Sequence, residues 1–198
     1  MGYTAEMLNI GRRIVVYGTT GSGKTTVAAR IAECLGVPHI ELDAVFWLPD
    51  WTKKPPDEYG AEVSALLERY QDGWVCDGNY RELRGITLPQ ADTVVWLWLP
   101  FRVIFWRLLK RTVRRAWTKE SLWGTNRESL LKAFFSRDSL LLYAITSRRR
   151  HRRGISRDLK EIPHRAKVYE LRSVKEVEGF LARLSSQGSQ VSPDRAGR

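Results

Sequence analysis

Residues 12–25 read Arg12-Arg13-Ile14-Val15-Val16-Tyr17-Gly18-Thr19-Thr20-Gly21-Ser22-Gly23-Lys24-Thr25. The apolar, β-branched run that ends at Tyr17 is typical of a buried strand. From Lys24 to Leu35 apolar residues recur at helical spacing, and Gly36 with Pro38 ends this pattern. The stretch therefore predicts a buried strand, a glycine-rich turn and an amphipathic helix in direct succession.

The glycine-rich turn matches the pattern G-x-x-x-x-G-K-[ST] in full, at Gly18, Gly23, Lys24 and Thr25. From average residue frequencies, a chance match in a chain of this size arises on the order of once in a hundred. In such a loop the backbone N–H groups and the helix N-terminus face phosphate groups. The lysine reaches the β- and γ-phosphates, and the threonine hydroxyl ligates Mg2+. We expect a nucleoside triphosphate to be bound by Gly18, Thr19, Thr20, Gly21, Ser22, Gly23, Lys24, Thr25 and Thr26.

Further strand and helix patterns alternate along the chain. Strands are predicted at residues 39–43, 74–77, 93–99 and 166–171, and helices at 57–70, 101–117 and 174–184. The run at 93–99 is apolar on both faces, as a central strand covered on both sides must be. Strands separated by helices at this spacing indicate a parallel α/β sheet with right-handed crossovers.

Length and composition favour one domain. The chain has 198 residues, of which 43% are hydrophobic, and this is enough for one well-filled core and too little for two. We predict a single domain over residues 1–184, with a basic, mostly helical lid at about 118–163, and a disordered tail over 185–198. No apolar stretch approaches the roughly 20 residues that cross a bilayer, and no secretory signal is present. A cytoplasmic protein without membrane contact is predicted.

The net charge of +11 is the unusual bulk property. Three interpretations stay open: nucleic-acid binding, a substrate site lined with arginine for polyphosphate, and a solvated basic surface. The run Arg148-Arg149-Arg150-His151-Arg152-Arg153 is contiguous rather than one-sided, which favours a lid end or a contact with a polyanion. Because no helix-turn-helix or zinc pattern frames this run, we expect only weak nonspecific nucleic-acid binding.

A nucleotide loop of this kind needs a second acidic group that holds or orients Mg2+, at the C-terminal end of a neighbouring strand. Asp77 ends the strand predicted at 74–77 and meets this requirement. The segment Asp77-Gly78-Asn79 is also typical of an Asx turn, and both interpretations can hold together. Thr25 and Asp77 are therefore the expected metal-site residues.

The chain resembles the adenylate-kinase-like P-loop kinases and, more narrowly, the small proteins named topology modulation (FlaR-like) proteins. The resemblance runs from about Arg12 to Leu184. Besides the loop it lies in Glu41-Leu42-Asp43-Ala44-Val45-Phe46-Trp47, in Asp77-Gly78-Asn79-Tyr80, and in the pair Arg107 and Arg111. It implies an α/β P-loop NTPase three-layer sandwich, with a five-stranded parallel sheet of order 2-3-1-4-5 and a basic helical lid insertion that closes over the phosphates.

The resemblance also bears on the phosphoryl acceptor. Arg81, in Asp77-Gly78-Asn79-Tyr80-Arg81, matches the arginine that contacts the acceptor phosphate in adenylate kinases; a surface arginine is the alternative. The chain lacks the acceptor-site glycine-rich pattern and the compact lid of those enzymes. AMP is therefore not implied as the acceptor.

Candidate catalytic residues lie outside the loop as well. Asp43, at the end of the strand predicted over 39–43, could accept the proton of an attacking hydroxyl; a helix cap or loop residue is the alternative. Trp47 belongs to an aromatic group that could wall a flat acceptor or simply pack the loop; its members are Phe46, Trp47, Trp51 and Tyr59. Arg107 and Arg111 fall on one face of the helix predicted at 101–117. Positive charge there would stabilise a transferring phosphoryl group, with a solvated basic face as the alternative.

Together these patterns predict a monomeric phosphotransferase that uses Mg-ATP by preference and phosphorylates a small acceptor, such as a nucleotide or a hydroxylated metabolite. The expected catalytic residues are Lys24, Asp43, Arg107 and Arg111, with ATP and Mg2+ as cofactors. Two alternatives remain: a regulatory nucleotide-binding protein that contacts DNA or a partner protein, and a polynucleotide kinase. The sequence does not name the acceptor.

Overall fold

The computed structural model describes residues 8–118, 121–122, 126–127, 153–157, 159 and 166–190. A five-stranded sheet of order β2-β3-β1-β4-β7 forms the centre of the fold, and all its strand pairs are parallel. In chain order the strands are β1 (Arg13–Gly18), β2 (His39–Glu41), β3 (Trp74–Asp77), β4 (Thr93–Leu97) and β7 (Lys167–Leu171). Counted along the chain this is the order 2-3-1-4-5, which confirms the predicted sheet.

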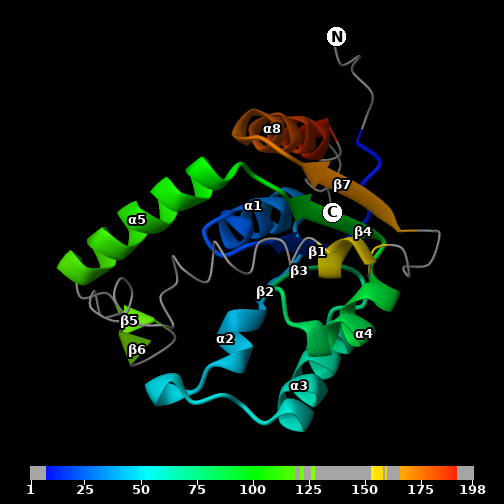
Figure 1. Ribbon diagram of the computed structural model, residues 1–198. Helices are drawn as coiled ribbons and strands as arrows, with labels where there is room; N and C mark the ends of the chain where they lie inside the picture. The colour runs from blue at the N-terminus through cyan, green and yellow to red at the C-terminus, as the bar shows by residue number, and fades with distance from the viewer. Residues whose placement is uncertain are drawn as a thin grey trace, which may run out of the picture.

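Helices cover both faces of the sheet (Figure 1). α1 (Lys24–Leu35) and α8 (Val174–Gln190) pack on one face, where they share a buried cluster with Ile14 and Val16 of β1. α3 (Pro56–Arg69) and α4 (Arg84–Thr87) lie on the other face, in a cluster with Val15 of β1. Because successive strand residues point to opposite faces, β1 is buried on both sides. Three layers result, as predicted.

Shorter elements connect these layers. α2 (Leu42–Phe46) and the 3-10 turn η1 (Pro49–Trp51) follow β2, and the 3-10 turns η2 (Arg81–Leu83) and η3 (Leu88–Gln90) flank α4. α5 (Phe101–Thr118) follows β4 and leads to an antiparallel pair, β5 (Ser121–Leu122) and β6 (Asn126–Arg127). Residues 153–157 are helical, and Ile155 is buried in the cluster on the α3 side.

The strand predicted over 39–43 is shorter in the structure. β2 ends at Glu41, and Asp43 lies in the first turn of α2 rather than at the end of a strand. The turn forms because the N–H of Trp47 donates to the Asp43 carbonyl at 3.2 Å, while Leu42 is buried in the core. Asp43 therefore lies two residues beyond the C-terminal end of β2.

The boundaries at the C-terminal side also differ from the prediction. α8 continues through Gln190, so residues 185–190 are helical and do not belong to the predicted disordered tail. Two contacts hold this extension: Ser185 Oγ lies 3.2 Å from Cys34 Sγ of α1, and Gln187 donates to the Leu8 carbonyl at 3.4 Å. Residues 191–198 lie outside the described part of the chain.

Most of the predicted lid, about residues 118–163, also lies outside the described residues, and so do residues 148–152 of the basic run. The pair β5 and β6 stands near the start of this region, where helix was predicted. No helix in the described ranges is both long enough and apolar enough to cross a membrane.

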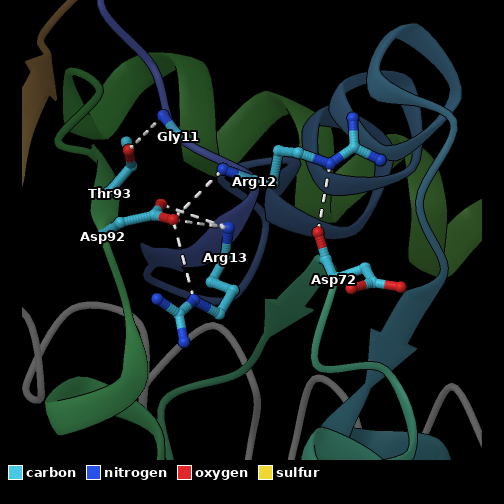
Figure 2. A network of polar contacts seen from close by, with 6 residues as sticks. All are labelled: Gly11, Arg12, Arg13, Asp72, Asp92 and Thr93. Atoms are coloured by element: carbon cyan, nitrogen blue, oxygen red, sulfur yellow. Dashed lines mark hydrogen bonds and ion pairs between the residues drawn. The ribbon is translucent and has the colours of Figure 1, made fainter.

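Asp92 joins the two central strands at the edge opposite the glycine-rich loop (Figure 2). Its carboxylate accepts the backbone N–H of Arg12 at 3.2 Å and that of Arg13 at 3.1 Å. The Arg12 side chain extends the network, because its Nε donates to the Asp72 carbonyl at 3.1 Å. These contacts fix the position at which β1 enters the sheet between β3 and β4.

We expect Asp92→Ala to lower the free energy of unfolding by about 2 kcal/mol, because two backbone N–H groups lose a charged acceptor. Urea unfolding followed by circular dichroism measures this loss. Asp72→Ala is the matched control: Asp72 accepts through its backbone carbonyl, so its substitution should cost less than about 0.5 kcal/mol. Equal losses in the two variants would contradict the role given to Asp92.

Candidate functional site

The loop between β1 and α1 has a conformation that glycine adopts most easily. Gly21 and Gly23 have φ angles of 78° and 87°, in the left-handed region. A Cβ atom on Gly18 would lie 2.3 Å from Ser22 Oγ, and one on Gly21 would lie 2.6 Å from Leu108 Cγ. The glycines of the sequence pattern are therefore required by backbone geometry and by close packing.

The loop and the start of α1 can receive an anion. The N-cap residue of α1 is Gly23, which makes no side-chain cap, and the first turn contains no acidic residue. The first N–H groups of the helix and the positive end of its dipole thus face the loop. The hydroxyl oxygens of Thr19 and Ser22 are buried without a hydrogen-bond partner among the described residues. A ligand with several phosphate oxygens fits these donors.

Asp77 is the buried acid beside this loop, with 1% of its surface exposed. Its Oδ2 accepts the hydroxyl of Thr25 at 2.8 Å, and its Oδ1 lies 2.8 Å from Nε2 of His39. Asp77 ends β3, Thr25 belongs to the first turn of α1, and His39 begins β2. One carboxylate therefore joins two strands and the helix of the phosphate loop, and it brings together the two predicted metal-site residues.

Asn79 connects the loop after β3 to the first residue of the phosphate loop. Its Nδ2 donates to the Gly18 carbonyl at 2.5 Å, and its Oδ1 accepts the Gly18 N–H at 3.4 Å. Gly78 makes this approach possible, because a Cβ atom there would lie 2.8 Å from Leu42. Both ends of the phosphate loop are thus tied to β3, through Asn79 at Gly18 and through Asp77 at Thr25.

Glu41 ends β2 within the same group of charges. Burial raises its pKa above the ordinary value of 4.5, and the negative charges of Asp77 and Asp43 raise this pKa further. His39 and Lys24 act in the opposite direction and lower the pKa of Glu41. Glu41 therefore lies within electrostatic range of both Asp43 and the loop lysine, Lys24.

Asp43 is held by the aromatic residues that follow it. The Tyr80 hydroxyl donates to Asp43 Oδ1 at 2.6 Å. Phe46 packs against Tyr80 and Tyr59, with ring centroids 4.6 Å and 5.1 Å away. Tyr59 is 2% exposed and donates to the Leu42 carbonyl at 3.2 Å. Of the two predicted roles of the aromatic group, Phe46 and Tyr59 thus fulfil the packing role and fasten α2 to α3.

α5 approaches the phosphate loop with one turn. Arg107 Nη1 donates to the Ser22 carbonyl at 2.7 Å, and Leu108 is buried against Gly21. Arg111 follows one helical turn later and is partly buried. The structure therefore brings Arg107 to the loop, as the cationic face of this helix predicts.

The remaining predicted binding residues are Arg81, Thr26 and Trp47. Arg81 begins η2 with an exposed side chain, and Thr26 is exposed on α1. Trp47 is partly buried, and its backbone pairs with Lys53 in an isolated antiparallel bridge. The structure joins Trp47 to Asp43 indirectly, since its side chain hydrogen-bonds Tyr80.

The oxygen atoms at this edge suit Mg2+, which prefers carboxylate and hydroxyl ligands and keeps several waters beside substrate phosphates. Within the described ranges, no group of three or more His, Cys, Asp or Glu side chains is arranged to hold a metal by itself. Thr25 and Asp77 are thus the residues that would hold Mg2+, together with phosphate oxygens and water. The residues present fit a triphosphate with its metal.

Sequence reasoning gave no role to four residues of this site: His39, Glu41, Asn79 and Tyr80. Glu41 had a signal, because it stands two residues before Asp43 in a predicted strand and so adds a second acid at the same edge. Asn79 and Tyr80 stood in the Asp77-Gly78-Asn79-Tyr80 segment without assigned partners. His39 carried no signal, since its partner lies 38 residues away.

Comparisons with known proteins agree with this geometry in part. No protein-family model matches the chain. The uncharacterized protein YqaC of Bacillus subtilis (strain 168) is 28% identical over 132 residues, which cover 65% of this chain and 72% of YqaC. The adenylate kinase of Thermotoga petrophila is 39% identical over 56 residues, which cover 28% of this chain and 24% of that enzyme.

Solved structures share the architecture over most of the chain. A sugar kinase from Janibacter sp. HTCC2649 has a TM-score of 0.50 and 18% identity, covering 91% of this chain and 93% of that chain. Shikimate kinase from Bacteroides thetaiotaomicron has a TM-score of 0.50 and 17% identity, covering 89% and 97%. The chain has the fold of the adenylate-kinase-like P-loop kinases and resembles small-molecule kinases of that fold.

We expect Asn79→Ala to weaken the binding of Mg-ATP about tenfold, because Gly18 loses both hydrogen bonds that fix it against β3. Isothermal titration calorimetry measures this affinity. Gln90→Ala is the control, since Gln90 also donates from its amide to a backbone carbonyl, that of Ile86 at 3.0 Å, but outside the loop. Unchanged affinity in Asn79→Ala would show that Gly18 needs no such restraint.

Glu41→Gln tests the charge cluster through pH. Because the pKa of Glu41 is raised in the folded state, its contribution to stability is present below 4.5 and is lost as pH rises through the folded-state pKa. Glu41→Gln should therefore be more stable than the parent at pH 7, with a difference that shrinks toward pH 4. Urea unfolding across this range measures it, with the exposed Glu33→Gln as control. A difference in unfolding free energy that stays constant from pH 4 to pH 7 would contradict the assignment of the effect to the raised pKa of Glu41.

Proposed function

We propose that the protein is a Mg2+-dependent phosphotransferase that moves the γ-phosphoryl group of ATP to a hydroxyl group of a small acceptor. The observation that supports this most is the 2.8 Å hydrogen bond between Thr25 and the buried Asp77 at the start of α1. A P-loop kinase needs a hydroxyl and an acid at this point, beside the phosphate-binding N–H groups. The fold shared with small-molecule kinases agrees with it.

On the donor side, the loop N–H groups and Lys24 bind the β- and γ-phosphates in this proposal. Mg2+ bound with the triphosphate supplies positive charge that neutralises the phosphate oxygens. Arg107 already contacts the Ser22 carbonyl with one donor, and a guanidinium has five. Its remaining donors, with those of Arg111, are assigned to the charge that develops on the transferring group.

On the acceptor side, Asp43 is assigned as the base. The acceptor hydroxyl loses its proton to this carboxylate while its oxygen bonds to the γ-phosphorus. The bond from that phosphorus to the β–γ bridging oxygen breaks, and ADP leaves with the electron pair. The charge of Asp43 raises the pKa of Glu41, and the charge of Lys24 lowers the same pKa. This chain of electrostatic contacts supports a common site for base and donor.

A hydroxyl acceptor is favoured over an anionic one. The charges of Asp77 and Asp43 both raise the pKa of Glu41, so a phosphate group beside these carboxylates would meet like charge. The exposed Arg81 is the predicted contact for an acceptor phosphate. The hydroxyl acceptor, the preference for ATP over GTP, the monomeric state and the cytoplasmic location remain predictions, and so does the narrower topology-modulation resemblance.

The transfer of label from γ-labelled ATP tests the proposal. With Mg2+, the acceptor panel should contain small hydroxylated metabolites, nucleosides, nucleoside monophosphates and short oligonucleotides. We expect one class of small hydroxylated acceptor to receive label, and Lys24→Ala and Asp43→Asn to reduce the rate by about a hundredfold or more. Lys167→Ala, at the start of β7 and exposed, is the matched control for the loss of a lysine.

Two outcomes would contradict the proposal in different ways. Label in oligonucleotides alone would indicate a polynucleotide kinase. ATP binding without transfer to any acceptor would favour a regulatory nucleotide-binding protein, the candidate that the net charge of +11 supports. In that case the DNA affinity should fall steeply as salt rises.

A further inference from the structure

We propose that Tyr80 is a positioning residue that orients the Asp43 carboxylate toward the acceptor, and that Trp47 fixes the direction of the Tyr80 hydroxyl. This inference rests on the proposed function, because it assigns further residues to the same phosphoryl transfer. It also gives Trp47 a role other than the predicted wall of an acceptor pocket.

The three side chains form a hydrogen-bond chain with a defined direction. Tyr80 donates to Asp43 Oδ1 at 2.6 Å, and the Trp47 side chain hydrogen-bonds Tyr80. An indole N–H can only donate, so the Tyr80 oxygen accepts from Trp47. The single hydroxyl proton of Tyr80 is then available for Asp43 alone, and the hydroxyl cannot turn away without breaking both bonds.

Tyr80 remains a donor under all physiological conditions. Burial raises its pKa above the ordinary value of 10.0, and the charge of Asp43 together with the hydrogen bond to it raises this pKa further. Tyr80 therefore keeps its proton and does not compete with Asp43 as a base. A bond from a neutral donor to a carboxylate is charge-assisted, and it is shorter and stronger than that of a neutral pair.

The aromatic packing makes this arrangement rigid. The Tyr80 ring lies 4.6 Å from Phe46 and 5.3 Å from Tyr59, measured between centroids. Tyr59, from α3, also holds the backbone next to the base, because its hydroxyl donates to the Leu42 carbonyl. Asp43 is thus restrained twice, at its side chain by Tyr80 and at its backbone by Tyr59. Only the first restraint aims the carboxylate.

The restraint leaves one oxygen for the reaction. Of the hydrogen bonds between described residues, the one from Tyr80 is the only one to the Asp43 side chain, and it occupies Oδ1. The acceptor proton is therefore assigned to Oδ2, while the acceptor oxygen bonds to phosphorus and ADP leaves. Because a misplacement of about 1 Å can cost a hundredfold in rate, the orientation of Oδ2 should matter for turnover.

Tyr80→Phe tests this role, with Tyr59→Phe as the matched control. Both substitutions remove one hydroxyl from the same aromatic group, but Tyr59 makes its hydrogen bond to the backbone. With the acceptor found in the label-transfer panel, we expect Tyr80→Phe to lower kcat about 10- to 100-fold and to leave the KM for ATP unchanged. Tyr59→Phe should lower the thermal midpoint and keep kcat within about twofold.

A second readout needs no turnover. The Cγ resonance of Asp43, followed by 13C NMR in the ligand-free protein, should move in Tyr80→Phe and stay in place in Tyr59→Phe. Should Tyr80→Phe fail to fold, Trp47→Phe carries the test. This variant keeps the Tyr80 hydroxyl but removes the hydrogen bond that fixes the direction of that hydroxyl. It should lower kcat in the same direction, by a smaller factor.

The outcomes separate this inference from the proposed function. Transfer by the parent and undiminished kcat in Tyr80→Phe would overturn the positioning role and leave the kinase proposal standing. Equal losses of kcat and stability in both tyrosine variants would assign Tyr80 to packing and overturn the inference as well. Absence of transfer by the parent would contradict the proposed function itself, and the inference would fall with it.

Discussion

The hydrogen bonds of Asp77 hold together the edge of the sheet that carries the phosphate loop. An acid that is 1% exposed must have partners in place, because an unpaired polar group away from water costs several kcal/mol. Thr25 and His39 meet that need from α1 and β2. The same contact brings the hydroxyl of the phosphate loop, the end of β3 and the start of β2 together. Three segments that are separate in the sequence thus form one site.

The phosphate loop is restrained from outside as well as by its own glycines. Asn79 holds Gly18 from the β3 side, while Arg107 holds the Ser22 carbonyl from α5. Leu108 fills the space above Gly21, where a Cβ atom would lie 2.6 Å from it. α5 leads directly into the basic region predicted as a lid. α5 thus contacts the loop through one hydrogen bond and one packing contact.

Features that depend on neighbours in sequence could be predicted, and those that depend on distant partners could not. The phosphate loop, its strand and its helix follow from residues 12–35, and the apolar run at 93–99 indicated a central strand, which the structure has at Thr93–Leu97. The sheet order came from the resemblance. By contrast, Tyr80 and Asp43 are 37 residues apart, and Asn79 and Gly18 are 61 apart. One of the two contacts at the extension of α8 joins Ser185 and Cys34, which are 151 residues apart. No local pattern contains such pairings.

The arrangement of charge at the site differs from the charge of the whole chain. The net charge is +11, yet the ends of β2 and β3 and the start of α2 present Glu41, Asp77 and Asp43 as a group of interacting carboxylates. Lys24 and Arg107 stand with the phosphate loop. Positive groups thus stand with the loop that is proposed to bind the triphosphate, and carboxylates stand close by, with Asp77 hydrogen-bonded to Thr25 of that loop. An acceptor that reacts beside these carboxylates is best neutral at its reacting group, since an anion would meet like charge there. A hydroxyl group satisfies this condition, and in the proposed mechanism its proton passes to Asp43.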